Sequence, residues 1–90
     1  MAKPSITKLP KIYRVQDLEG KTWVGIGSCS GRSEAMHHVQ AVLASAGIEP
    51  IIEGSVMYRI CVLETDIHRA LDLLKEDADA SIYKIELYDT

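Results

Sequence analysis

The stretch VMYRICVL, residues Val56–Leu63, alternates along its whole length between two sets of side chains. One set consists of Val56, Tyr58, Ile60 and Val62, and the other of Met57, Arg59, Cys61 and Leu63. Successive side chains of a β-strand point to opposite faces of the sheet, so this pattern predicts a strand with one face in a core. It is the strongest strand pattern in the chain.

Four other segments carry strand or turn signals. Gly54-Ser55 predicts a turn from a partner strand at Glu49–Glu53, where Pro50 cannot donate to a ladder and therefore favours an edge position. The pattern Thr-Trp-Val-Gly-Ile-Gly predicts a strand over Thr22–Gly27, with Val24 and Ile26 on one face and Trp23, Gly25 and Gly27 on the other. A last strand is predicted over Ser81–Tyr88. Its inward residues are Tyr83, Ile85 and Leu87, and its outward residues are Lys84, Glu86 and Tyr88.

Two helices are predicted from apolar residues that recur at helical spacing. The first spans Ser33–Ala46, with Ser30 or Ser33 as its N-cap, and Gly47 follows where a left-handed residue is favoured. The second begins after Thr65, whose side chain is a typical N-cap. The buried stripes consist of Ala35, Met36, Val39, Val42, Leu43 and Ala46 in the first helix, and of Ile67, Ala70, Leu71, Leu74 and Ala78 in the second.

The order strand, helix, strand, strand, helix, strand predicts an α+β fold, the ferredoxin-like βαββαβ sandwich, with an antiparallel sheet and both helices on one face. We expect a flexible segment over residues 1–10 and one domain over residues 11–90. Lys11–Gln16 also alternates, and Asp17–Gly20 is typical of a turn, so an extra N-terminal strand is predicted. In that fold the strand at Trp23 already has two neighbours, and the place of the extra strand stays open.

Composition excludes several classes of protein. The chain has 90 residues and a formal net charge of −3, without a basic run, which argues against nucleic-acid binding and against a polybasic membrane tether. No apolar run is long enough to span a bilayer, and no signal-peptide pattern is present, so we expect a cytoplasmic protein. Cys29 and Cys61 are then expected to be reduced thiols.

Small residues link the predicted strand at Trp23 to the first helix. Gly25, Gly27 and Gly31, together with Ser28 and Ser30, would expose backbone amides at a helix N-terminus, which is a typical anion site. Arg32 is the expected charged contact. The alternative is a tight turn that simply requires small residues.

The sequence contains no strong pattern of catalytic or metal-binding residues. Cys29 could be activated at a helix N-terminus, but no neighbouring residue in sequence supplies a base. His37 and His38 are adjacent and point about 100° apart on a helix, so they cannot chelate one ion together. With His68 they are expected to face solvent. We therefore expect no enzyme, no metal site and no cofactor.

The uncovered face of the sheet is the more informative feature. Trp23, Met57, Cys61, Leu63 and Tyr88 are expected to share it with Arg59, Lys84 and Glu86. An apolar patch of this kind on a small protein usually meets a partner. We expect an interface here, formed either with a second copy or with another protein.

Parts of the chain resemble ACT-type regulatory domains. The resemblance lies in the glycine-bearing strand-to-helix loop after Val24, in LASAGI at residues 43–48, and in YRICVL at 58–63 followed by DIHRAL at 66–71. ACT domains commonly pair and bind small effectors, often amino acids. By resemblance, the ligand-binding residues are Gly27, Ser28, Ser30, Gly31, Arg32, Ile48 and Glu49. Glu49, where such domains often carry asparagine, and Pro50 depart from the pattern.

A second resemblance is to small prokaryotic signal-transducing proteins of unknown role, which share the Ala-Gly-Ile helix ending and the later Ala70–Leu74 helix. The combined interpretation is a non-enzymatic regulatory domain that self-associates and binds a small anionic metabolite or amino acid at its first strand-helix loop. The alternative is an adaptor that binds another protein through the open sheet face.

Overall fold

The computed structural model describes residues 13–88, which form an antiparallel sheet and two α-helices around one core. The strands are β1 (Tyr13–Gln16), β2 (Thr22–Ser30), β3 (Ile51–Gly54), β4 (Met57–Leu63) and β5 (Glu86–Leu87). The helices are α1 (Ser33–Ala44) and α2 (Ile67–Lys75), and a 3₁₀ turn, η1 (Glu64–Asp66), precedes α2. This confirms the predicted α+β class.

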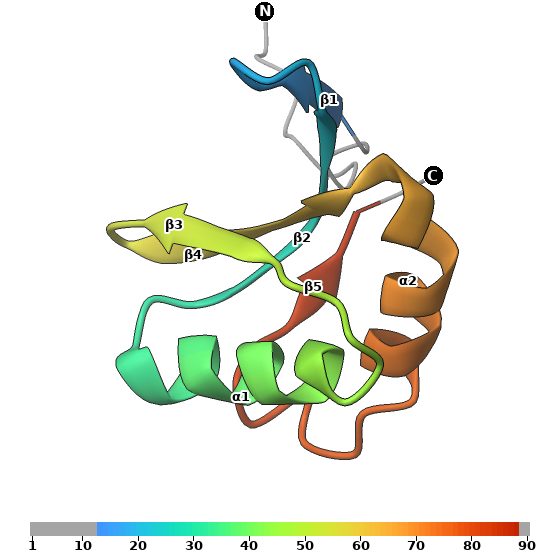
Figure 1. The fold of residues 1–90 in the computed structure, drawn as a ribbon. Helices are drawn as coiled ribbons and strands as arrows, with labels where there is room; N and C mark the ends of the chain where they lie inside the picture. Colours follow the sequence, from blue (N-terminus) through green and yellow to red (C-terminus); the bar gives the residue numbers. More distant parts are fainter. Residues whose placement is uncertain (1–12, 89–90) are drawn as a thin grey trace, which may run out of the picture.

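Strand pairing explains where the N-terminal strand fits. The sheet runs β1-β2-β4-β3, and β5 also pairs with β2. β1 lies beside the first part of β2, from Thr22 to Gly25, whereas β5 lies beside Gly27 and Ser28. The two strands thus divide one edge of β2 between them (Figure 1). The arrangement is consistent with a ferredoxin-like sandwich, although the additional strand leaves that exact order unconfirmed.

Both helices pack against the same face of the sheet (Figure 1). Their buried residues join the inward side chains of β2 and β4 in one cluster. Its members are Val24, Ile26, Cys29, Ala35, Val39, Leu43, Ile48, Ile60, Val62, Ala70, Leu71 and Leu74. The predicted stripes therefore identified most of the packing residues correctly. The exceptions are Met36, which is not part of this cluster, and exposed Ala78, which lies beyond the end of α2.

A β-bulge changes the orientation of the end of β2. Gly25 pairs with Cys61 and Gly27 with Ile60, so Ile26 is an extra residue between them. At a bulge, two residues of one strand lie opposite one residue of the partner strand. Before the bulge the even-numbered residues of β2 face the helices, and after it the odd-numbered residues do. Gly27 and Cys29 consequently face inward, which corrects the prediction that Gly27 shares a face with Trp23.

Several predicted boundaries were wrong. The expected strand over residues 81–88 is reduced to β5, because residues 77–84 form successive turns after Asp77 and Asp79, both good turn residues. Arg32 and Asp66 occupy the N-cap positions and neither caps with its side chain, so the predicted serine and threonine caps are not formed. Gly47 does adopt the left-handed conformation, with φ +74°. The predicted segment at residues 1–10 lies outside the described residues.

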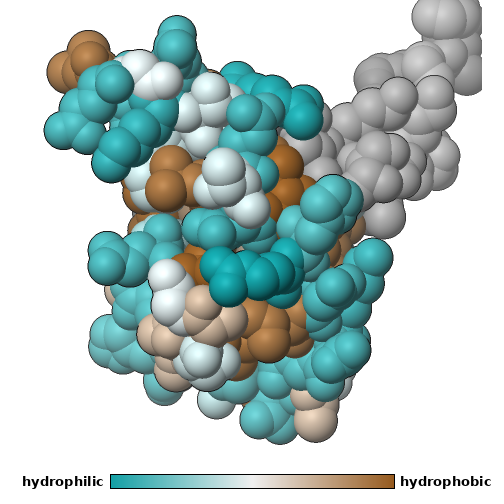
Figure 2. Space-filling model, turned by 45° about the vertical axis from the view of Figure 1, so that its right-hand side comes forward, coloured by the Kyte–Doolittle hydropathy of each residue, from teal (hydrophilic) through white to brown (hydrophobic). Residues whose placement is uncertain are grey.

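No helix among residues 13–88 combines the length and the apolar character that crossing a membrane requires. On the side of the molecule seen in Figure 2, apolar surface forms patches separated by polar side chains.

Candidate functional site

The face of the sheet opposite the helices is the main candidate site. Its residues follow from the strand register, since directly paired residues point to the same side. Trp23 pairs with Leu63 and with Val15, and Cys61 pairs with Gly25 and with Ile51. No helix or strand within residues 13–88 lies over this surface, which we call the open face.

The open face is charged across its middle and apolar on both sides, with Val15 and Ile51 on one side of the charged residues and Met57 on the other. Val15, Ile51 and Met57 are 54%, 39% and 48% exposed, values that are high for large apolar side chains. A cross-strand row then runs over four strands and consists of Glu53, Arg59, Ser28 and Glu86. The face thus presents both signs of charge beside apolar surface.

Two shallow hollows lie on the open face, and Arg59 borders both. One, of about 320 Å³, is lined by Ser28, Met57, Tyr58, Arg59, Glu86, Leu87 and Tyr88. The other, of about 230 Å³, is lined by Val15, Asp17, Trp23, Ile51, Glu53, Arg59 and Cys61. Five of the six predicted interface residues, Trp23, Met57, Arg59, Cys61 and Tyr88, line these hollows, and Leu63 lies beside Trp23 in the register.

The indole of Trp23 is held in place by the β1–β2 turn. Its Nε1–H donates to Asp17 Oδ2 over 2.8 Å, while Asp17 Oδ1 accepts the backbone amides of Glu19 and Lys21. The hydrogen bond from Trp23 is the largest influence on the pKa of Asp17 and lowers it; desolvation opposes this effect, and the backbone hydrogen bonds and the charge of Lys21 lower the pKa further. The turn predicted at Asp17–Gly20 therefore also orients an open-face residue.

The predicted ligand residues do not gather in one hollow. β2 continues to Ser30, whose amide donates to the carbonyl of Tyr83 over 2.9 Å. A Cβ on Gly31 would stand 2.3 Å from the carbonyl oxygen of Val56, so Gly31 permits close backbone packing, as the tight-turn alternative requires. Ile48 is buried in the core, whereas Arg32 and Glu49 are exposed. An effector site on these residues stays a prediction.

Cys29 is a core residue rather than a loop residue. It is fully buried in β2 opposite Tyr58, and desolvation raises the pKa of its thiol. Thiolate activation, considered for a cysteine at a helix N-terminus, is therefore opposed by the position that this side chain occupies.

Sequence reasoning missed a second cluster. His38 was expected to face solvent, as His37 and His68 do, but its side chain is only 18% exposed and its Nε2 lies 2.6 Å from Asp77 Oδ2. Asp77 and the nearby Asp79 lie in the segment that follows α2. No local spacing could have revealed the contact, because His38 and Asp77 are 39 positions apart.

Comparisons of the chain with protein-family models, with curated proteins and with solved structures found no match.

Proposed function

We propose that this chain is a ferredoxin-like, non-enzymatic regulatory domain that pairs with a second copy of itself through the open face. The observation that supports the proposal is the combination of exposed Val15, Ile51 and Met57 with a charged row on one uncovered sheet surface. Burying apolar area of this kind contributes roughly 25 cal/mol per Å².

The charges favour a second copy over a partner of another kind. In a twofold interface the same patch meets itself, so it must carry groups that complement one another. The row contains Arg59 between Glu53 and Glu86, separated from the latter by Ser28. Turned by a twofold axis, Arg59 of one copy can face Glu86 of the other, whereas a patch of single sign would repel its copy.

The first test is the change Met57→Asp, measured by sedimentation of the full chain over a range of concentrations. Met57 is 48% exposed, so the fold should tolerate the change, while a carboxylate at a buried interface should weaken association at least tenfold. Ile82→Asp is the matched control, because Ile82 is also an exposed apolar residue but lies between α2 and β5. A wild-type chain that stays monomeric at every concentration would contradict self-pairing.

Charge reversal then tests the orientation. Arg59→Glu alone should weaken association by like-charge repulsion, and the double change Arg59→Glu/Glu86→Arg should restore it. If the double variant associates no more tightly than Arg59→Glu does, the two copies do not meet through this row. If wild type is a monomer that binds a different protein through Met57, the adaptor alternative replaces the present proposal.

A further inference from the structure

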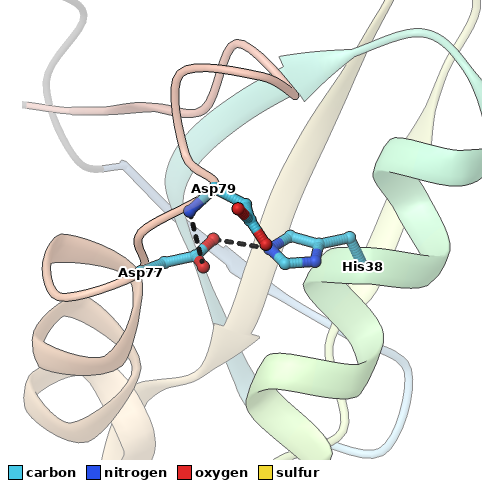
Figure 3. Close-up of side chains that lie close together, drawn as sticks. All are labelled: His38, Asp77 and Asp79. Atoms are coloured by element: carbon cyan, nitrogen blue, oxygen red, sulfur yellow. Dashed lines mark hydrogen bonds and ion pairs between the residues drawn. The ribbon is translucent and has the colours of Figure 1, made fainter.

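A second cluster of polar side chains lies away from the open face. His38 comes from α1, and Asp77 and Asp79 come from the segment that follows α2 (Figure 3). One ligand atom from each residue lies within 4.8 Å of the others. Both carboxylates point at the same edge of the imidazole ring, so three potential metal ligands converge from two separate elements.

Neighbouring groups hold two of these ligands in place. The ring of His38 stacks on Tyr83, with 4.4 Å between ring centroids and 22° between the planes. Asp77 Oδ1 accepts the backbone amide of Asp79 over 3.2 Å, which leaves Oδ2 directed at His38. The side chains of His38 and Asp77 are 18% and 9% exposed, whereas Asp79 is exposed and can adjust. Support of this kind is typical of metal ligands.

The charge of the cluster suits a divalent cation. Two carboxylates face one imidazole, and within residues 13–88 neither carboxylate forms an ion pair with a lysine or arginine. Around a tetrahedral ion with bonds of about 2.0–2.2 Å, donor atoms stand about 3.3–3.6 Å apart. To reach that spacing, His38 Nε2 and Asp77 Oδ2, which lie 2.6 Å apart, must move apart as the ion replaces their hydrogen bond, and the exposed Asp79 side chain must rotate toward the ion.

We propose that His38, Asp77 and Asp79 bind a first-row divalent cation, with Zn²⁺ as the best-suited ion. Imidazole favours zinc and its neighbours over magnesium and calcium, which prefer all-oxygen ligand sets. Three protein ligands leave a position for water. The ion ties α1 to the turns that lead into β5, and this site is independent of the open face and of self-pairing.

The test titrates the untagged full chain with Zn²⁺, after dialysis against a chelator, by calorimetry and thermal unfolding. We expect one ion per chain and a rise in Tm, because an ion that binds only the folded state stabilises it. Asp79→Asn should weaken binding at least tenfold, because it removes one of the three charged or imidazole ligands. His37→Gln and Asp72→Asn are matched controls, because His37 is an exposed histidine of α1 and Asp72 is an exposed aspartate of α2, and neither belongs to the cluster.

Asp79→Asn also separates the metal site from a simple hydrogen bond between His38 and Asp77. Asp79 is exposed and its carboxylate is not part of that hydrogen bond, so the variant should fold normally and should lose only the response to zinc. Wild type without heat of binding or Tm shift overturns the proposal, and so does an Asp79→Asn variant that binds as wild type does. Mg²⁺ that binds as tightly as Zn²⁺ overturns the assignment of the ion.

Discussion

The two faces of β4 differ in burial. Ile60 and Val62 are completely buried under the helices, whereas Met57, on the same strand, is 48% exposed. Both sets are largely apolar, so hydrophobicity alone does not separate core from surface. What separates them is the position of α1 and α2, which together cover only one side. An apolar residue on the uncovered side contributes little to folding and is available for association.

The largest expected effect comes from two isoleucines, one on each face. Ile26→Ala should lower the free energy of unfolding by about 2–5 kcal/mol, because it leaves a cavity in a fully packed core. Ile51→Ala, at a side chain that is 39% exposed on the open face, should cost at most about 1 kcal/mol. Urea unfolding at low protein concentration measures both changes.

Ile26→Val keeps this comparison usable if the alanine variant does not fold, with an expected loss of about 0.5–1.5 kcal/mol. If the changes at Ile26 and Ile51 lowered the free energy of unfolding of the monomer equally, the open face would also be part of the folding core.

A second, smaller contrast comes from the two cysteines. Cys29 lies on the covered face and Cys61 on the open face, where it is partly exposed. Burial excludes reagents from Cys29 and raises the pKa of its thiol, so the reactive thiolate is scarce at neutral pH. In a Cys61→Ser variant, Cys29 should react with a disulfide reagent at least about tenfold more slowly than Cys61 does in a Cys29→Ser variant. If Cys29 in the native chain reacted as fast as it does in the chain unfolded by urea, the helices would separate readily from the sheet.

The sequence predicted the features that depend on one segment at a time. The alternation along Met57–Leu63, most of the apolar stripes of the helices and the turn at Asp17 each follow from local spacing, and each is confirmed. Val56, expected on the core face, is instead 87% exposed and precedes β4. The bulge at Ile26 depends on how two strands pair, so the periodicity of β2 alone placed Cys29 in a loop. The cluster at His38 depends on packing between α1 and a distant turn, and no local pattern reports such a contact. Self-pairing and the effector site stay predictions.

The smallest expected effect concerns Trp23, which lies on the open face and donates a hydrogen bond to Asp17 of the β1–β2 turn. Its hydrogen bond is the main cause of the lowered pKa of Asp17, so the folded state binds the Asp17 proton more weakly than the unfolded state does. The stabilisation is therefore present above the unfolded pKa and is lost as pH falls through the folded one, below about pH 4. Trp23→Phe should lower the free energy of unfolding at pH 7. At pH 3 the difference in unfolding free energy between the variant and wild type should be smaller.

Urea midpoints at the two pH values measure this change. The loss of indole packing lowers the free energy of unfolding equally at both pH values. A smaller difference between variant and wild type at pH 3 than at pH 7 therefore reports the hydrogen bond alone. Asp17→Asn is the control, because it keeps an acceptor oxygen for the indole and removes the titration. In that background the effect of Trp23→Phe should be the same at both pH values, and a difference that widened on acidification would contradict the proposed role of Asp17 in orienting this open-face residue.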